Sequence, residues 1–159
     1  MKKILLSALT IITFISISYS QGLSSRETIE YINSKFPSKF QVSVEKEYEM
    51  HIDFYKEGTV YRTDKIYLPT LDPKKSKYNP DENALSMYCL SEMTKEFRKF
   101  SDGCVQREFH QKKMIKFYNR INLPVGEDEK TINGLIAAFK HLILISTDEG
   151  DYMGVDYFE

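Results

Sequence analysis

Two cysteines and three histidines are the residues of this chain with the most specific chemistry, and their spacing limits what they can do. Cys89 and Cys104 lie fifteen positions apart. We expect this chain to be exported, on grounds given below, and in an exported chain a pair of cysteines indicates first of all a disulfide. The spacing also suits two neighbouring strands. We therefore predict a Cys89–Cys104 disulfide, which stabilises by about 3 kcal/mol in the chain-entropy model.

The alternative for the cysteines is a catalytic thiol, with His51, His110 or His141 as its general base. The residues that flank Cys89 and Cys104 do not form a recognisable protease signature. Neither cysteine follows a predicted helix N-terminus, which would lower the pKa of its thiol. We therefore predict no catalytic residue, and a small enzyme that uses Cys or His chemistry remains the weaker alternative.

A metal site is the second chemistry that the histidines suggest. His51 and Asp53 lie two positions apart in a predicted strand, so they share one face, and His110 could complete a three-ligand set. The same face continues a row of acidic residues, namely Glu45, Glu47 and Glu49. Acids at every second position are typical of a solvated strand face rather than of paired glycosidase carboxylates. We predict no metal and no cofactor.

A basic segment supplies the candidate binding residues. Residues 71–83, LDPKKSKYNPDEN, contain two prolines and no apolar period, which predicts a surface loop. Lys74, Lys75, Lys77 and Tyr78 lie in it. In an inhibitor or immunity-type protein, these lysines would meet acidic groups in the active site of a partner. In the alternative interpretation they are part of a solvated surface.

The first residues of the chain indicate export. A basic start, Lys2–Lys3, precedes an apolar run over residues 4–17, and small residues end at Ser20. This order predicts a signal peptide over residues 1–20, cleaved before Gln21. The apolar run is shorter than the roughly 20 residues that span a bilayer. We expect a periplasmic or extracellular protein without a membrane span in its mature form.

The mature chain is of ordinary size for one domain, which we place at 21–146, followed by an acidic, aromatic C-terminal tail at 147–159. It carries 20 basic against 23 acidic side chains, a net charge of −3, which disfavours nucleic acid as a partner. The charge is uneven. Residues 72–120 carry 11 basic and 7 acidic groups, whereas 121–159 carry 2 and 8.

The first elements follow from local patterns. Ser24 and Glu27 form a capping box, which predicts a helix that ends before Pro37. Apolar residues then fall on even numbers from 40 to 54, a period that predicts a half-buried antiparallel sheet with a bend near 45–47. A turn at Gly58 leads into a second strand over 59–68.

Further strands are predicted over 84–90, 104–110 and 114–123, while 91–100 fits a strand or a helix, with the strand favoured. A C-terminal helix is predicted over 128–146 because apolar residues recur at three- and four-residue steps. These are Ile132, Leu135, Ile136, Phe139, Leu142 and Ile143. Gly134 in this helix is predicted to let it approach a strand closely.

Three stretches resemble small exported bacterial families of uncharacterised function, of the Bacteroidota type. They are ETIEYINSKF at 27–36, IDFYKEGTVYR at 52–62 and INGLIAAFKHLI at 132–143. The resemblance implies an α+β fold similar to a pleckstrin-homology-like arrangement. In it, one bent antiparallel sheet or partly open barrel of about six strands packs against an N-terminal helix and a long C-terminal helix. It implies no catalytic residues.

The expectation is an exported, non-catalytic domain that binds a protein or a component of the cell envelope. An inhibitor or immunity-type protein is the alternative within binding, and a small envelope enzyme is the alternative outside it.

Overall fold

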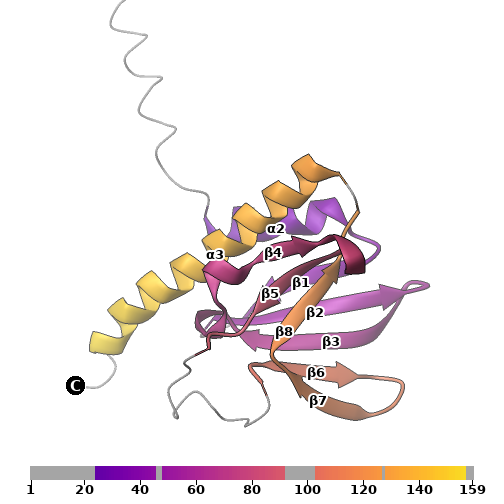
Figure 1. The fold of residues 1–159 in the computed structure, drawn as a ribbon. Coiled ribbons are helices and arrows are strands. Elements are labelled where there is room, and N and C mark those ends of the chain that lie inside the picture. The colour runs from indigo at the N-terminus through magenta and orange to yellow at the C-terminus, as the bar shows by residue number, and fades with distance from the viewer. Residues whose placement is uncertain (1–23, 46–47, 92–102, 127, 157–159) are drawn as a thin grey trace, which may run out of the picture.

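The computed structural model describes residues 24–45, 48–91, 103–126 and 128–156. The predicted signal peptide at 1–20 lies outside the described residues, as does nearly all of the segment 91–100 for which a strand was predicted. The described chain has an α+β fold with two helices and two antiparallel sheets (Figure 1). The helices lie together on one side of the sheets (Figure 1).

Helix α2, Ser25–Lys35, begins at the predicted capping box. The backbone amide of Ser24 donates to Glu27 Oε2 at 2.9 Å, and the amide of Glu27 donates to Ser24 Oγ at 3.3 Å. The Ser24 hydroxyl also donates to Glu27 Oε2, at 2.7 Å, and this bond, together with the one from the Ser24 amide, holds the pKa of Glu27 below its usual value. Lys35 is the last helical residue, and Phe36 is the C-cap. The helix does not continue because Pro37 follows, and proline has no amide donor.

The larger sheet has five strands in the order β1-β2-β3-β6-β7. Their bounds are Phe40–Val44, Glu49–Lys56, Thr59–Tyr67, Val105–Phe109 and Met114–Tyr118. The predicted alternation is confirmed, since the even-numbered residues of β1 and β2 are buried, apart from the terminal ones. Strand β1 ends at Val44 and β2 begins at Glu49, so the predicted bend at 45–47 falls between the two strands.

The second sheet has three strands in the order β4-β5-β8, and their bounds are Lys77–Asn79, Ala84–Tyr88 and Arg120–Pro124. The prediction of a single sheet is therefore wrong. The predicted strand 114–123 is interrupted at Asn119, so that β7 pairs with β6 while β8 pairs with β5. A bend at Asn119 lets the chain leave the larger sheet and enter the smaller one.

The segment 71–83 is more regular than the predicted loop. It contains strand β4 and two 3₁₀ turns, η3 at Pro73–Lys75 and η4 at Pro80–Glu82. A further turn, η2 at Leu68–Thr70, leads into it. Each of these turns has a proline in its first positions, where the missing amide costs no hydrogen bond.

Helix α3, Glu129–Asp156, closes the fold. Asp128 precedes it and accepts a hydrogen bond from the Thr131 amide at 2.8 Å. Hydrogen bonds with the side chain and then the backbone of Thr131 lower the pKa of the Asp128 carboxyl. The helix extends ten residues past the predicted end at Ser146. Within the described part of the chain, no helix combines the length and the apolar character that a bilayer crossing requires.

The apolar stripe of α3 is buried as predicted, but its closest neighbour at Gly134 is different. A Cβ atom at Gly134 would collide with the hydroxyl of Tyr31, which belongs to α2. The predicted close approach to a strand is therefore wrong, because the glycine faces the other helix. The core lies between the two helices and the sheets, and its largest fully buried side chains include Phe40, Phe54, Phe139, Met50, Leu85 and Ile121.

Candidate functional site

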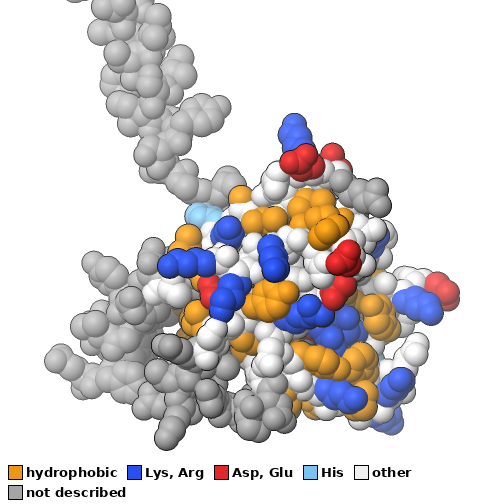
Figure 2. Space-filling model, in the orientation of Figure 1, with side chains coloured by type: hydrophobic (Ala, Val, Ile, Leu, Met, Phe, Trp, Pro, Cys, Tyr) orange, Lys and Arg blue, Asp and Glu red, His pale blue; other side chains and the backbone are white. Residues whose placement is uncertain are grey.

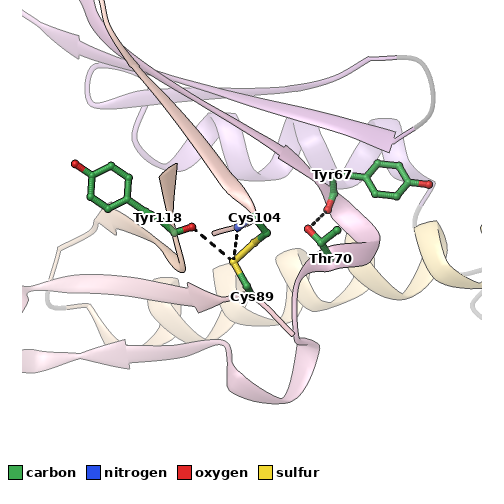
Figure 3. The surroundings of a disulfide bond; sticks show 5 residues. All are labelled: Tyr67, Thr70, Cys89, Cys104 and Tyr118. Atoms are coloured by element: carbon green, nitrogen blue, oxygen red, sulfur yellow. Dashed lines mark hydrogen bonds between the residues drawn. A yellow bond between two sulfur atoms is a disulfide. The ribbon is translucent and has the colours of Figure 1, made fainter. Parts of the chain in front are cut away.

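The predicted disulfide between Cys89 and Cys104 is confirmed. It joins the residue after β5 to the residue before β6, so it links the two sheets covalently (Figure 3). The Cα atoms are 5.9 Å apart, and the Cys104 amide also donates to the sulfur of Cys89 at 3.3 Å. With both sulfurs bonded to each other, neither is present as the thiolate that nucleophilic catalysis requires.

The outer face of the five-stranded sheet carries a small polar cluster of Asp53, Thr63 and His110. The Thr63 hydroxyl donates to Asp53 Oδ1 at 2.6 Å, and Nε2 of His110 lies 2.8 Å from the same hydroxyl oxygen. Because the hydroxyl has one proton and gives it to Asp53, His110 must be the donor at Nε2. His110 is therefore not placed to act as a base toward Thr63, which is the role that a serine-type triad needs.

The three residues considered as a possible metal-ligand set, His51, Asp53 and His110, are only partly brought together. Asp53 and His110 meet through Thr63, whereas the ring of His51 contacts Glu49 Oε1 at 2.5 Å instead. Within the residues that the structure describes, no three His, Cys, Asp or Glu side chains are arranged to hold a metal ion. Sequence reasoning missed Thr63, although it lies directly opposite Asp53 in the β2–β3 pair.

A neighbouring ion pair lies on the same outer face. Lys65 Nζ is 2.9 Å from Glu108 Oε1, and Gln106 donates to the same carboxylate at 2.9 Å. The hydrogen bond from Lys65 holds the pKa of Glu108 below its usual value. These groups satisfy one another, so this face is already neutralised along β3 and β6.

The inner face of the same strands holds a buried charge that sequence reasoning also missed. Asp64 is fully buried and contacts two arginines, Arg62 and Arg107. Arg62 lies over the ring of Phe54 at 3.5 Å, and Arg107 lies over the ring of Tyr118 at 4.2 Å. Burial lowers the pKa of Arg62, and the negative charge of Asp64 opposes that shift. The sequence feature that could have revealed this charge is Asp64 itself, an acid at a core-facing position of β3.

The predicted binding residues lie on the face formed by the three-stranded sheet, where Figure 2 shows several basic side chains. Lys75 Nζ is 3.4 Å from Asp72 Oδ2, and Tyr78 donates its hydroxyl proton to Asn83. Lys77 lies 5.9 Å from the ring centre of Tyr88.

Lys74 and Lys77 are exposed. Their role in binding remains a prediction, as does that of Lys75 and Tyr78.

Beside these lysines, the small sheet carries a connected polar network. Arg120 Nη2 donates to Glu82 Oε1 at 2.8 Å, and Asn122 links the same carboxylate to the buried hydroxyl of Ser86. Hydrogen bonds with Tyr88 and Glu82 raise the pKa of Arg120. The acid and the base of this network neutralise each other, so it gives the face no uncompensated charge.

A groove of about 650 Å³ lies between α2, α3, turn η2 and the break between β1 and β2. Its lining is mainly apolar and includes Ile29, Val44, Tyr48, Leu68, Leu142 and Ile145. Tyr48 has a φ of 61°, in the left-handed region that costs a non-glycine residue about 1–2 kcal/mol. The core packing therefore holds Tyr48 in an unfavourable backbone conformation beside the groove.

The polar lining residues of this groove are Ser25, Arg26, Glu30 and Glu45. Arg26 Nε is 2.9 Å from Glu30 Oε1, and both side chains are exposed. The carboxylate of Glu45 lies 4.0 Å from the His51 ring. Sequence reasoning did not find this groove, because its walls come from four separated segments.

Comparison with protein-family models, with curated proteins and with solved structures finds no match for this chain.

Proposed function

We propose that this chain is an exported, non-catalytic binding domain whose groove between α2 and α3 holds a short apolar segment of a protein partner. The observation that carries the proposal is the groove itself, about 650 Å³ with a mainly apolar lining surface. Concave apolar sites with a few polar groups at the margin are the usual form of a binding site. An amphipathic segment would bury its apolar side chains there.

The charges beside the groove favour a peptide over a lipid. Among its described lining residues, Glu30 and Glu45 are acids, and the one basic residue, Arg26, is paired with Glu30. An anionic lipid headgroup or a fatty-acid carboxylate would meet these carboxylates and be repelled. A peptide with a lysine or arginine beside its apolar residues would instead be attracted, because its cation faces Glu45.

The side chains that could act in catalysis already form a disulfide or hydrogen bonds within the protein, which supports a binding role. The two cysteines form a disulfide, and the Thr63 proton is given to Asp53. The Asp64 carboxylate is held by arginines. Each of these arrangements contributes to stability.

Export belongs to the same proposal. A disulfide that links the two sheets suits an oxidising compartment, where such bonds persist. We place the mature protein in the periplasm or outside the cell, after cleavage between Ser20 and Gln21. The pleckstrin-homology-like arrangement also stays part of the proposal, supported by antiparallel sheets and a long C-terminal helix.

Defined probes test the groove in the mature protein. The first is a capped peptide, acetyl-Lys-Ile-Leu-Ile-Lys-amide, and the second replaces both lysines with glutamates. Palmitate is the third. We expect the basic peptide to bind and the acidic peptide to bind about tenfold more weakly, measured by calorimetry. Tighter binding of palmitate, or no binding of the basic peptide, would contradict the proposal.

A matched pair of variants locates the binding. Ile145→Arg places a charge in the groove. Leu144→Arg changes the preceding residue of α3, whose side chain is 50 % exposed and does not line the groove. We expect Ile145→Arg to weaken the basic peptide about tenfold and Leu144→Arg to leave it unchanged. Equal effects of the two variants would place the peptide elsewhere.

A further inference from the structure

Among the described residues, strand β7 is an edge of the five-stranded sheet, since β6 is the only described strand that pairs with it. Its residue Ile115 is 55 % exposed, which is unusual for a large aliphatic side chain. An edge strand presents backbone donors and acceptors on its open side, and another extended chain can pair with them. The edge of β7 therefore offers both hydrogen-bonding groups and an apolar side chain to an incoming strand.

The charge around this edge is basic. Lys112 and Lys113 lie in the turn that leads into β7, and Lys116 lies within it, all three exposed. Among the described residues, none of the three forms an ion pair with an acid. Figure 2 shows basic and apolar side chains next to each other over β6 and β7.

The nearest groups of β6 do not neutralise these lysines. Glu108 is paired with Ile115 across the two strands, but its carboxylate is bound by Lys65. Arg107, which is opposite Lys116, is also a cation and forms an ion pair with Asp64. It therefore does not neutralise Lys116. The basic charge of the edge is therefore available to a partner.

We propose that the β7 edge binds an acidic, extended segment of a partner protein by strand addition. This surface is separate from the groove between α2 and α3. The positive charge of these lysines determines which kind of strand can pair with β7. Antiparallel pairing with a second copy of β7 would bring two sets of lysines together, which is how natural edge strands avoid self-association. An acidic strand would meet the same lysines favourably.

The acidic C-terminal part of the same chain does not supply this segment. It is helical as far as Asp156, and α3 lies at the opposite side of the molecule from β7 (Figure 1). The described part of the acidic C-terminal region is therefore not available to this edge, and we assign the occupant to another protein. Backbone hydrogen bonds would provide affinity, and acids spaced to meet the lysines would provide selectivity.

The test uses three capped peptides and the mature protein. The first is acetyl-Glu-Val-Asp-Val-Asp-Val-Glu-amide, and the second carries lysines in place of its acids. The third keeps the sequence and its acids but is N-methylated at every backbone amide nitrogen, so it carries the same charge without the backbone amide donors. We expect the first to bind, and the other two to bind about tenfold more weakly or not at all.

Variants then assign the site. The double variant Lys113→Glu and Lys116→Glu should weaken the acidic peptide by about tenfold or more. The double variant Lys74→Glu and Lys77→Glu, in turn η3 and strand β4, should leave it unchanged. Hydrogen exchange of the β7 amides should slow on binding, which a purely electrostatic contact would not cause.

Three outcomes would overturn the proposal: no binding of the acidic peptide, equal binding of the N-methylated peptide, or equal effects of the two double variants. The variant Ile145→Arg, which blocks the groove, should not change this binding. The failure of one surface is therefore distinguishable from the failure of the other.

Discussion

The carboxylate of Asp64 accepts two parallel hydrogen bonds from the guanidinium group of Arg107. Nε meets Oδ1 and Nη2 meets Oδ2, both at 2.8 Å, across the β3–β6 pair. A second guanidinium, from Arg62, contacts the same carboxylate at 3.2 Å and reaches the backbone oxygen of Asn122 in β8 at 3.4 Å. Through Arg62, this buried acid connects the larger sheet to the edge of the smaller one.

The variant Asp64→Asn should lower the free energy of unfolding by about 3–5 kcal/mol, because it leaves two largely buried arginines without their acid. Urea unfolding followed by circular dichroism measures this change. The exposed pair Arg26–Glu30 is the control, and Glu30→Gln should cost less than about 0.5 kcal/mol. A loss below about 1 kcal/mol for Asp64→Asn would show that the buried acid is not needed for stability.

Gly103→Ala should destabilise the protein by about 1–3 kcal/mol or more. The glycine has a φ of +149°, and a Cβ atom there would collide with the backbone of Tyr118, which cannot move aside cheaply. Thermal unfolding measures the effect.

Gly134→Ala is the matched comparison for that variant. Its Cβ atom would meet the end of the Tyr31 side chain, which can rotate away, and alanine favours a helix by about 1 kcal/mol over glycine. The two variants should therefore differ in melting temperature, with Gly103→Ala lower. The reverse order would contradict the arrangement of both glycines.

Removal of the disulfide, by Cys89→Ala together with Cys104→Ala, should lower the free energy of unfolding by about 3 kcal/mol. The wild-type protein under a strong reductant should approach the stability of the double variant, since both then lack the bond between the sheets. Thiol titration provides the control. A free thiol in the unreduced, denatured wild-type protein would count against the disulfide.

The ion pair of Lys65 and Glu108 should make the free energy of unfolding depend on pH in the acidic range. Because the folded-state pKa of Glu108 is depressed, its contribution is present above the unfolded pKa of about 4.3 and is lost as the pH falls through the folded value. Comparison of the wild type with Lys65→Met at several pH values measures this. The difference in unfolding free energy should be largest near neutral pH and should shrink below about pH 4. A difference that is constant with pH would indicate lost packing instead.

Local patterns were sufficient to predict much of this fold. The capping box of Ser24 and Glu27, the stop before Pro37 and the alternation of β1 and β2 depend on neighbouring residues only. The pairing of Cys89 with Cys104 was also predictable, since an exported chain with two cysteines has one intramolecular choice.

The split into two sheets was not predictable in this way. The sequence at Asn119 contains no proline or glycine to mark a break, and the change of partner from β6 to β5 depends on where distant strands lie. In the same way, Gly134 was correctly singled out, but its neighbour Tyr31 is on a helix whose position only the packing decides.

By itself, the sequence determined the capped start of the first helix, the buried face of each apolar pattern and the disulfide, because those features follow from local backbone geometry and from cysteine chemistry. The tertiary structure alone decided which side chains meet across strands and helices. The bond of Arg107 with Asp64, the cluster around Thr63 and the groove beside Tyr48 all join segments far apart in the chain. Their registers are set by long-range pairing and packing, which no local pattern records.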